Sequence, residues 1–122
     1  MKYDITELLK NWGFDPDNNI RFIKDETGRE IMQIRLPLGI EQYELNDRPD
    51  GKKPLGKKSY LEFYEEQRQK CIKQEKSFSL TNSDFKLLRE EALLYYYRYI
   101  VLFQIGEYDL TISDTEHNLS IC

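Results

Sequence analysis

A chain of 122 residues is long enough for one small domain with its own hydrophobic core, and its composition is that of a folded protein. The formal net charge of −4 argues against a nucleic-acid backbone as the main partner. The first residues lack the apolar run of a signal peptide, and two cysteines are too few for a disulfide framework or a metal cluster. We therefore expect a cytoplasmic protein.

Residues 1–47 predict a short helix followed by a small antiparallel sheet. Asp4 can cap a helix that runs to about Asn11, and Gly13 ends it. Alternating strand-like segments at 20–24 and 30–36 flank a loop that contains Gly28, which predicts a hairpin.

The second strand leaves two readings open. Its alternating apolar residues predict one pleated apolar face that continues through a proline and a glycine. Either Pro37 to Gly39 turn the chain into a third strand, or one long bent strand continues. We prefer three strands, because a two-stranded hairpin alone is marginally stable. The face consists of Met32, Ile34, Leu36, Leu38 and Ile40.

Residues 48–58 form a basic loop that carries +4, whereas the rest of the chain carries −8. The segment from Gly51 to Lys57 has the Gly-x-x-x-x-Gly-Lys spacing of a phosphate-binding loop, but Lys58 stands where that loop needs a hydroxyl. We expect a solvent-exposed connection without regular structure, which can hold an anion or an acidic partner surface. The candidate binding residues are Arg48, Lys52, Lys53, Lys57 and Lys58.

Residues 59–122 predict three helices. Ser59 with Glu62 begins the first at residue 60, and it ends near residue 76. Thr81 with Asp84 begins the long central helix, which Gly106 ends, and a last helix begins near residue 109.

Residues 92–105 of the central helix are apolar except for Arg98 and Gln104, so we expect neighbours to cover this stretch nearly all round. Arg98 should pair with a carboxylate or reach solvent along its stem. The predicted buried stripe consists of Phe85, Leu88, Ala92, Tyr95, Tyr99 and Leu102.

The sequence shows no catalytic constellation, so we expect no enzyme, no cofactor and no metal. His117 reads as a lone surface histidine, and no pair of carboxylates is isolated in apolar surroundings. Cys71 is expected to face a core, and both it and Cys122 are expected to be reduced thiols.

From Ala92 onward the chain resembles one tetratricopeptide repeat unit, with Tyr95 at the large aromatic position and Gly106-Glu107-Tyr108 at the turn. The resemblance implies a helical hairpin. The family has small residues where this chain has Tyr99, Thr111 and Asn118, which implies a different packing of the two helices.

The earlier part resembles a family of uncharacterised bacterial proteins with an Arg-Pro-Asp-Gly motif, here residues 48–51. The segments Asn-Trp-Gly-Phe-Asp-Pro at 11–16 and Leu-Gly-Ile at 38–40 also carry the likeness. Longer relatives are labelled for a UvrB/UvrC-type motif, of which this chain shows no copy. The family's chains continue further, which implies that this one is shortened.

Together these patterns predict an α+β fold and a single domain over residues 1–122: helix plus β-meander at 1–47, basic loop at 48–58, helical part at 59–122. We expect a protein–protein interaction or adaptor module that forms a homodimer through its last two helices. The alternative is a nucleic-acid-associated accessory protein that uses the basic loop.

Overall fold

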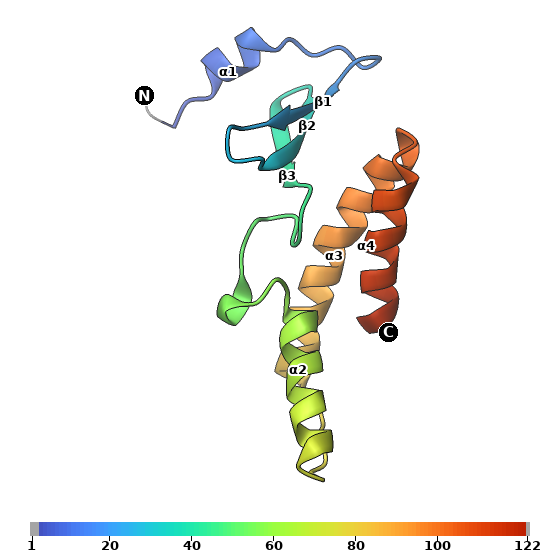
Figure 1. Ribbon diagram of the computed structural model, residues 1–122. Coiled ribbons are helices and arrows are strands. Elements are labelled where there is room, and N and C mark those ends of the chain that lie inside the picture. The colour runs from blue at the N-terminus through green and yellow to red at the C-terminus, as the bar shows by residue number, and fades with distance from the viewer. Residues whose placement is uncertain (1–2, 122) are drawn as a thin grey trace. The chain divides into compact units, whose positions relative to one another are not determined.

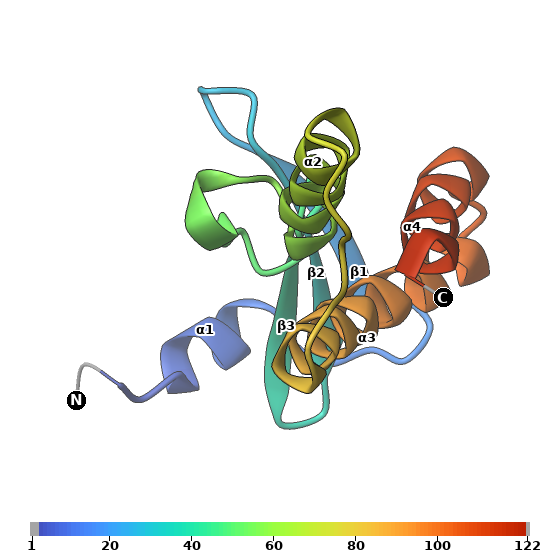
Figure 2. The same cartoon turned by 90° about the horizontal axis from the view of Figure 1, so that it is seen from below.

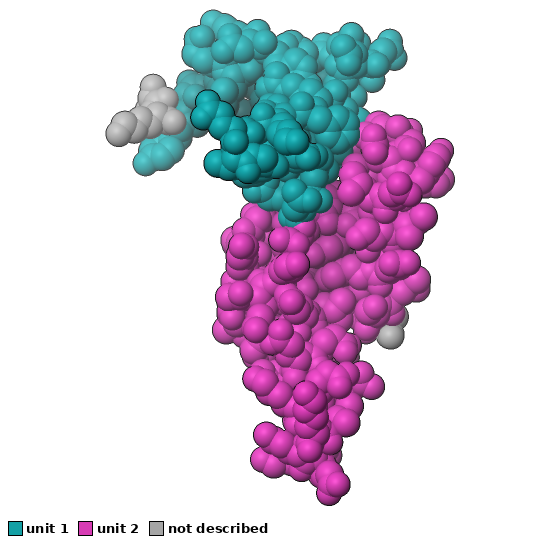
Figure 3. Space-filling model, in the orientation of Figure 1, with its two compact units in different colours: residues 1–46 teal, residues 47–122 magenta. Residues whose placement is uncertain are grey.

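The computed structural model describes residues 3–121, which form an α+β fold of helices and an antiparallel sheet. The chain divides into two compact units, Met1–Asn46 and Asp47–Cys122, coloured separately in Figure 3. The division falls at the predicted end of the β-meander. The single domain stays a prediction.

The first unit contains helix α1 (Thr6–Asn11) and a sheet of β1 (Ile20–Lys24), β2 (Glu30–Leu36) and β3 (Gly39–Glu44), shown in Figure 1. The strand order is β1-β2-β3, and both pairings are antiparallel. The predicted third strand is therefore confirmed.

Local hydrogen bonds and backbone geometry define the two turns of the sheet. The Asp25 carboxylate accepts hydrogen bonds from the backbone N–H groups of Thr27 at 2.9 Å and Arg29 at 3.0 Å, and Gly28 has a φ of 87°. Between β2 and β3, Leu36 pairs with Gly39, so Pro37 and Leu38 alone make the turn. A proline in this turn removes no ladder hydrogen bond.

Strand β2 is buried on both of its faces, because Ile31 and Arg35 lie on one face and Met32 and Ile34 on the other. The predicted apolar face does not continue past these residues. The prediction that this face continues through Leu38 is wrong, because Leu38 lies in the turn between β2 and β3. Its side chain is outside the ladder and 89% exposed.

Arg35 joins the end of α1 to the sheet. Its Nε donates to the Trp12 carbonyl oxygen at 2.6 Å, and Nη2 lies 3.3 Å from the Leu9 carbonyl oxygen. Nη1 donates to the carbonyl oxygens of Leu36 and Pro37 in the turn. These carbonyl oxygens provide a buried guanidinium with the acceptors that it needs.

The second unit contains the short 3₁₀ helix η1 (Pro54–Gly56) and the helices α2 (Tyr60–Lys73), α3 (Asn82–Gln104) and α4 (Tyr108–Ile121). The basic loop thus holds one regular turn that the prediction excluded. Helix α2 ends at Lys73 and not near residue 76, and Glu75 beyond it has a φ of 56°.

The predicted caps Ser59 and Thr81 set the starts of α2 and α3, whereas the N-cap of α1 is Ile5 and not the predicted Asp4. The Ser59 hydroxyl oxygen accepts a hydrogen bond from the Glu62 backbone N–H at 3.0 Å. Thr81 and Asp84 form a complete capping box, with bonds of 3.1 Å and 2.8 Å between each side chain and the other's backbone N–H. Gly106, with a φ of 83°, ends α3 as predicted.

Helices α3 and α4 lie side by side as a helical hairpin, which Figures 1 and 2 show from two directions. The buried stripe of α3 differs from the predicted one: Phe85 is exposed, and Ala92 and Tyr99 are half-buried. The observed buried stripe includes two charged residues, Glu91 and Arg98, and each forms an ion pair with a residue of the same unit. It consists of Leu88, Glu91, Tyr95, Arg98 and Leu102.

The apolar stretch of α3 is covered on one side only, so the expectation of cover all round is wrong. Leu93, Tyr96, Tyr97 and Phe103 are exposed. Cys71 is half-buried on α2, a helix without fully buried residues, and Cys122 lies outside the described residues. No helix within residues 3–121 combines the length and apolar character that crossing a membrane requires.

Candidate functional site

The second unit, called the helical unit below, has a polar centre at the carboxylate of Glu91. This side chain is fully buried in the middle of α3. One oxygen accepts a hydrogen bond from the Tyr60 backbone N–H at 2.7 Å, and the other accepts from the Leu61 backbone N–H at 3.2 Å. These are the first two residues of α2, whose N–H groups have no partner within the helix. Glu91 therefore fastens α2 to α3.

Two basic side chains share the Glu91 carboxylate. Arg48 Nη1 lies 3.4 Å from Oε1, and His117 Nε2 of α4 lies 3.1 Å from Oε2. Arg48 also lies 3.1 Å from Asp50, and its guanidinium stands 5.3 Å from the ring centre of Tyr60. The start of the basic loop, α2 and α4 thus converge on one side chain of α3.

His117 is a core residue of the helical unit. Its side chain is only 11% exposed, and its ring stacks on Tyr95 with 3.6 Å between ring centres and 4° between planes. Its Nδ1 lies 3.2 Å from the Asn118 amide oxygen. The prediction of a surface histidine is wrong, because α4 presents this residue to α3.

A second buried ion pair lies about two helical turns further along α3. Arg98 donates to both carboxylate oxygens of Asp114, at 2.8 Å and 2.6 Å, and its guanidinium lies 5.0 Å from the Tyr95 ring centre. Burial raises the pKa of the Tyr95 hydroxyl above its ordinary value, with nearby Glu91 and Asp114 adding to the effect. The predicted pairing of Arg98 with a carboxylate is confirmed.

The buried cluster has the chemistry of a structural network. It consists of Arg48, Glu91, Tyr95, Arg98, Asp114 and His117. Every charge in it faces an opposite charge, which is what burial of ionised groups requires. No group of three or more His, Cys, Asp or Glu side chains in the described part of the chain could hold a metal ion.

The structure separates the five predicted binding residues of the basic loop. Arg48 is buried against Glu91, so the expectation that the whole loop is exposed is wrong at this residue. Lys57 pairs with Glu66 of α2 at 2.7 Å, whereas Lys52, Lys53 and Lys58 are exposed. Anion or nucleic-acid binding by this loop stays a prediction.

An apolar groove of about 440 Å³ lies where α3 meets α4. Leu93 and Tyr96 of α3 are 50% and 42% exposed. The Asn118 side chain donates to the Ala92 carbonyl oxygen at 3.0 Å, which ties α4 to α3 at the groove. The lining residues are Arg89, Ala92, Leu93, Tyr96 and Asn118.

Sequence reasoning missed Glu91, Asp114 and this groove. A signal for Glu91 was present, because it stands seven residues before Arg98 and between Leu88 and Tyr95 at helical spacing. Asp114 gave no comparable signal, because its partner comes from another helix.

Comparisons with known protein families, with curated proteins and with solved structures find no match for this chain. The resemblances to a tetratricopeptide unit and to the Arg-Pro-Asp-Gly family therefore stay predictions.

Proposed function

We propose that the protein is a protein–protein interaction module whose contact surface is the apolar groove of the α3–α4 hairpin. The observation that carries the proposal is the half-exposed pair Leu93 and Tyr96 beside a groove of about 440 Å³. Exposed apolar surface that gathers around a groove is typical of interaction sites. The buried ion pairs hold the two helices that form it.

The occupant that fits this groove is an amphipathic helix of a partner protein. A groove between two helices accepts apolar side chains that recur every three or four residues along a partner helix. Arg89 is the charged residue of the lining, and it favours a carboxylate on that helix. The partner chemistry is therefore a helix with apolar anchors and an acidic residue.

Selection from a library of helical peptides tests this proposal. We expect selected peptides to combine apolar residues at helical spacing with an acidic residue. Their affinity should fall at least about tenfold for Leu93→Asp, because the substitution places a charge in the groove. Arg89→Gln should remove the salt-dependent part of the affinity.

Phe103→Asp is the matched control, because Phe103 is an exposed apolar residue of the same helix that does not line the groove. It should leave peptide affinity unchanged. Peptides that bind wild type and Leu93→Asp equally well, or a library that yields no binder, would contradict the proposed function.

A further inference from the structure

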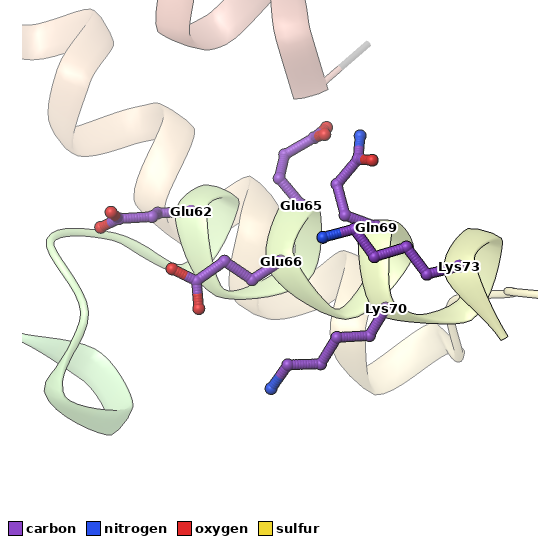
Figure 4. A pocket seen from close by; sticks show the side chains of 6 residues that line it. All are labelled: Glu62, Glu65, Glu66, Gln69, Lys70 and Lys73. Atoms are coloured by element: carbon purple, nitrogen blue, oxygen red, sulfur yellow. The ribbon is translucent and has the colours of Figure 1, made fainter.

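The outward face of α2 carries charged side chains in an ordered pattern. A shallow groove of about 560 Å³ runs along this helix, and Figure 4 shows the six side chains that line it. Acidic residues occupy its N-terminal half and lysines its C-terminal half. The lining residues are Glu62, Glu65, Glu66, Gln69, Lys70 and Lys73. We call this set the α2 stripe.

The α2 stripe lies on the side of the helix that faces away from α3. Tyr64 donates its hydroxyl to Asp84 of α3 at 2.7 Å, so the Tyr64 side of α2 packs on α3. Glu62 and Glu66 lie two residues from Tyr64 in either direction and so point to the opposite side.

The α2 stripe is complementary to itself when a second copy of the helix runs antiparallel to it. The six residues then form three pairs, and the two members of each pair are equally distant along the helix from the midpoint between Gln67 and Arg68. A two-fold axis through this midpoint places each residue opposite its pair on the second helix. Every contact of residue i with residue j then occurs twice. The pairs are Glu62 with Lys73, Glu65 with Lys70, and Glu66 with Gln69.

Compensation of the helix dipole does not account for the whole pattern. That effect acts within the first and last turns of a helix. Glu65 and Glu66 lie beyond the first turn of α2, whereas Lys70 and Lys73 belong to its last turn. Lys70 and Lys73 have no ion-pair partner among the residues that the structure describes.

We propose that α2 is a self-recognition surface, on which the α2 stripe pairs with the α2 stripe of a second copy in antiparallel orientation. Each dimer then contains the Glu65–Lys70 contact twice. Charge pairs at such a surface set orientation and partner choice more than affinity. Because salt screens exposed charges, the dimer should weaken as the salt concentration rises. The proposal goes beyond the apolar groove and uses none of its residues.

Charge reversal at one pair tests the proposal. Glu65 lies 3.6 Å from Arg68 within its own chain, so Glu65→Lys and Lys70→Glu are both needed as independent variants. Each places like charges opposite each other twice in the dimer. Sedimentation equilibrium should show a dimer constant weaker by about tenfold for either single variant.

Two combinations should restore association. The double variant Glu65→Lys/Lys70→Glu is again self-complementary, so it should dimerise like wild type. An equimolar mixture of the two single variants should form a heterodimer. Glu90→Lys and Lys86→Glu change the net charge by the same amounts at exposed positions of α3 and should leave the dimer unchanged.

Circular dichroism establishes that each variant is folded. A monomeric wild type, a single variant that dimerises like wild type, or a double variant that stays monomeric would each overturn the proposal. Loss of the dimer in Leu119→Asp but in neither charge variant would also overturn it and assign self-association to the last two helices. Groove-peptide binding by Glu65→Lys reports on the proposed function separately.

Discussion

Glu91 is a charged residue in a position where a helix usually buries an apolar one. A buried carboxylate is costly unless hydrogen bonds and opposite charges compensate it. Here two backbone N–H groups of α2 bond the carboxylate, and Arg48 and His117 approach it from the loop and from α4. Glu91 therefore joins three segments to α3.

Glu91→Gln should destabilise the protein by about 3–5 kcal/mol, because it leaves the buried Arg48 guanidinium without its Glu91 counter-charge and turns an amide N–H₂ toward backbone donors. Urea unfolding measures the loss. Glu90→Gln, an exposed neighbour, should stay within about 0.5 kcal/mol of wild type. Equal stability of the two variants would contradict the role of Glu91.

The Arg98–Asp114 pair should show strong coupling in a double-mutant cycle. Arg98→Met or Asp114→Leu alone leaves one buried charge, and each should cost about 3–5 kcal/mol. The combined variant replaces the pair by apolar side chains and should be more stable than either single one. Chemical unfolding of the four proteins provides the cycle, and losses that simply add would refute it.

The sequence predicted the strong apolar members of the core, Leu88, Tyr95 and Leu102, from their spacing. It did not predict the charged members, because apolar periodicity assigns charged residues to the solvent side. His117 was misplaced for the same reason. A buried charge becomes recognisable only when its partner is known, and here the partners come from other helices and from the basic loop.

The starts of α2 and α3 and the end of α3 were well predicted, because local chemistry sets them, whereas the end of α2 was not. Ser59, Thr81 and Gly106 each act at the position that the sequence indicated. The faces of the helices were less predictable. Helix α2 has no fully buried residue, and its orientation follows from Glu91 and from the Tyr64–Asp84 hydrogen bond.

The contact between α2 and α3 should weaken at alkaline pH. Burial, with the hydrogen bond to Asp84, raises the pKa of Tyr64 from 10.0 to about 12. The unfolded chain then loses this proton at a lower pH than the folded chain. The contribution of Tyr64 is complete below pH 10 and is lost as the pH rises through about 12.

Urea unfolding across this pH range measures the decline. Tyr64→Phe should reduce the slope with which the free energy of unfolding falls as the pH rises. Tyr97→Phe, which removes a hydroxyl from an exposed position of α3, should leave this slope unchanged. The same slope in wild type and Tyr64→Phe would show that the Tyr64 hydroxyl does not stabilise the folded state as described.

At the scale of the whole molecule, the chain comprises two compact units, and the polar network that organises the second lies entirely within it. A fragment of residues 47–122 should therefore fold alone, with a helical circular dichroism spectrum and a cooperative urea transition. A fragment that shows no cooperative transition would mean that this unit needs residues 1–46.

Both proposed surfaces depend on the way in which Glu91 fixes α2 and α4 on α3. Hydrogen exchange at the backbone N–H groups of Tyr60 and Leu61 tests this claim most directly, because such groups at a helix N-terminus ordinarily lack a partner. We expect both to be strongly protected in the wild-type protein and to exchange quickly in Glu91→Gln. Rapid exchange of both groups in the folded wild-type protein would contradict the account.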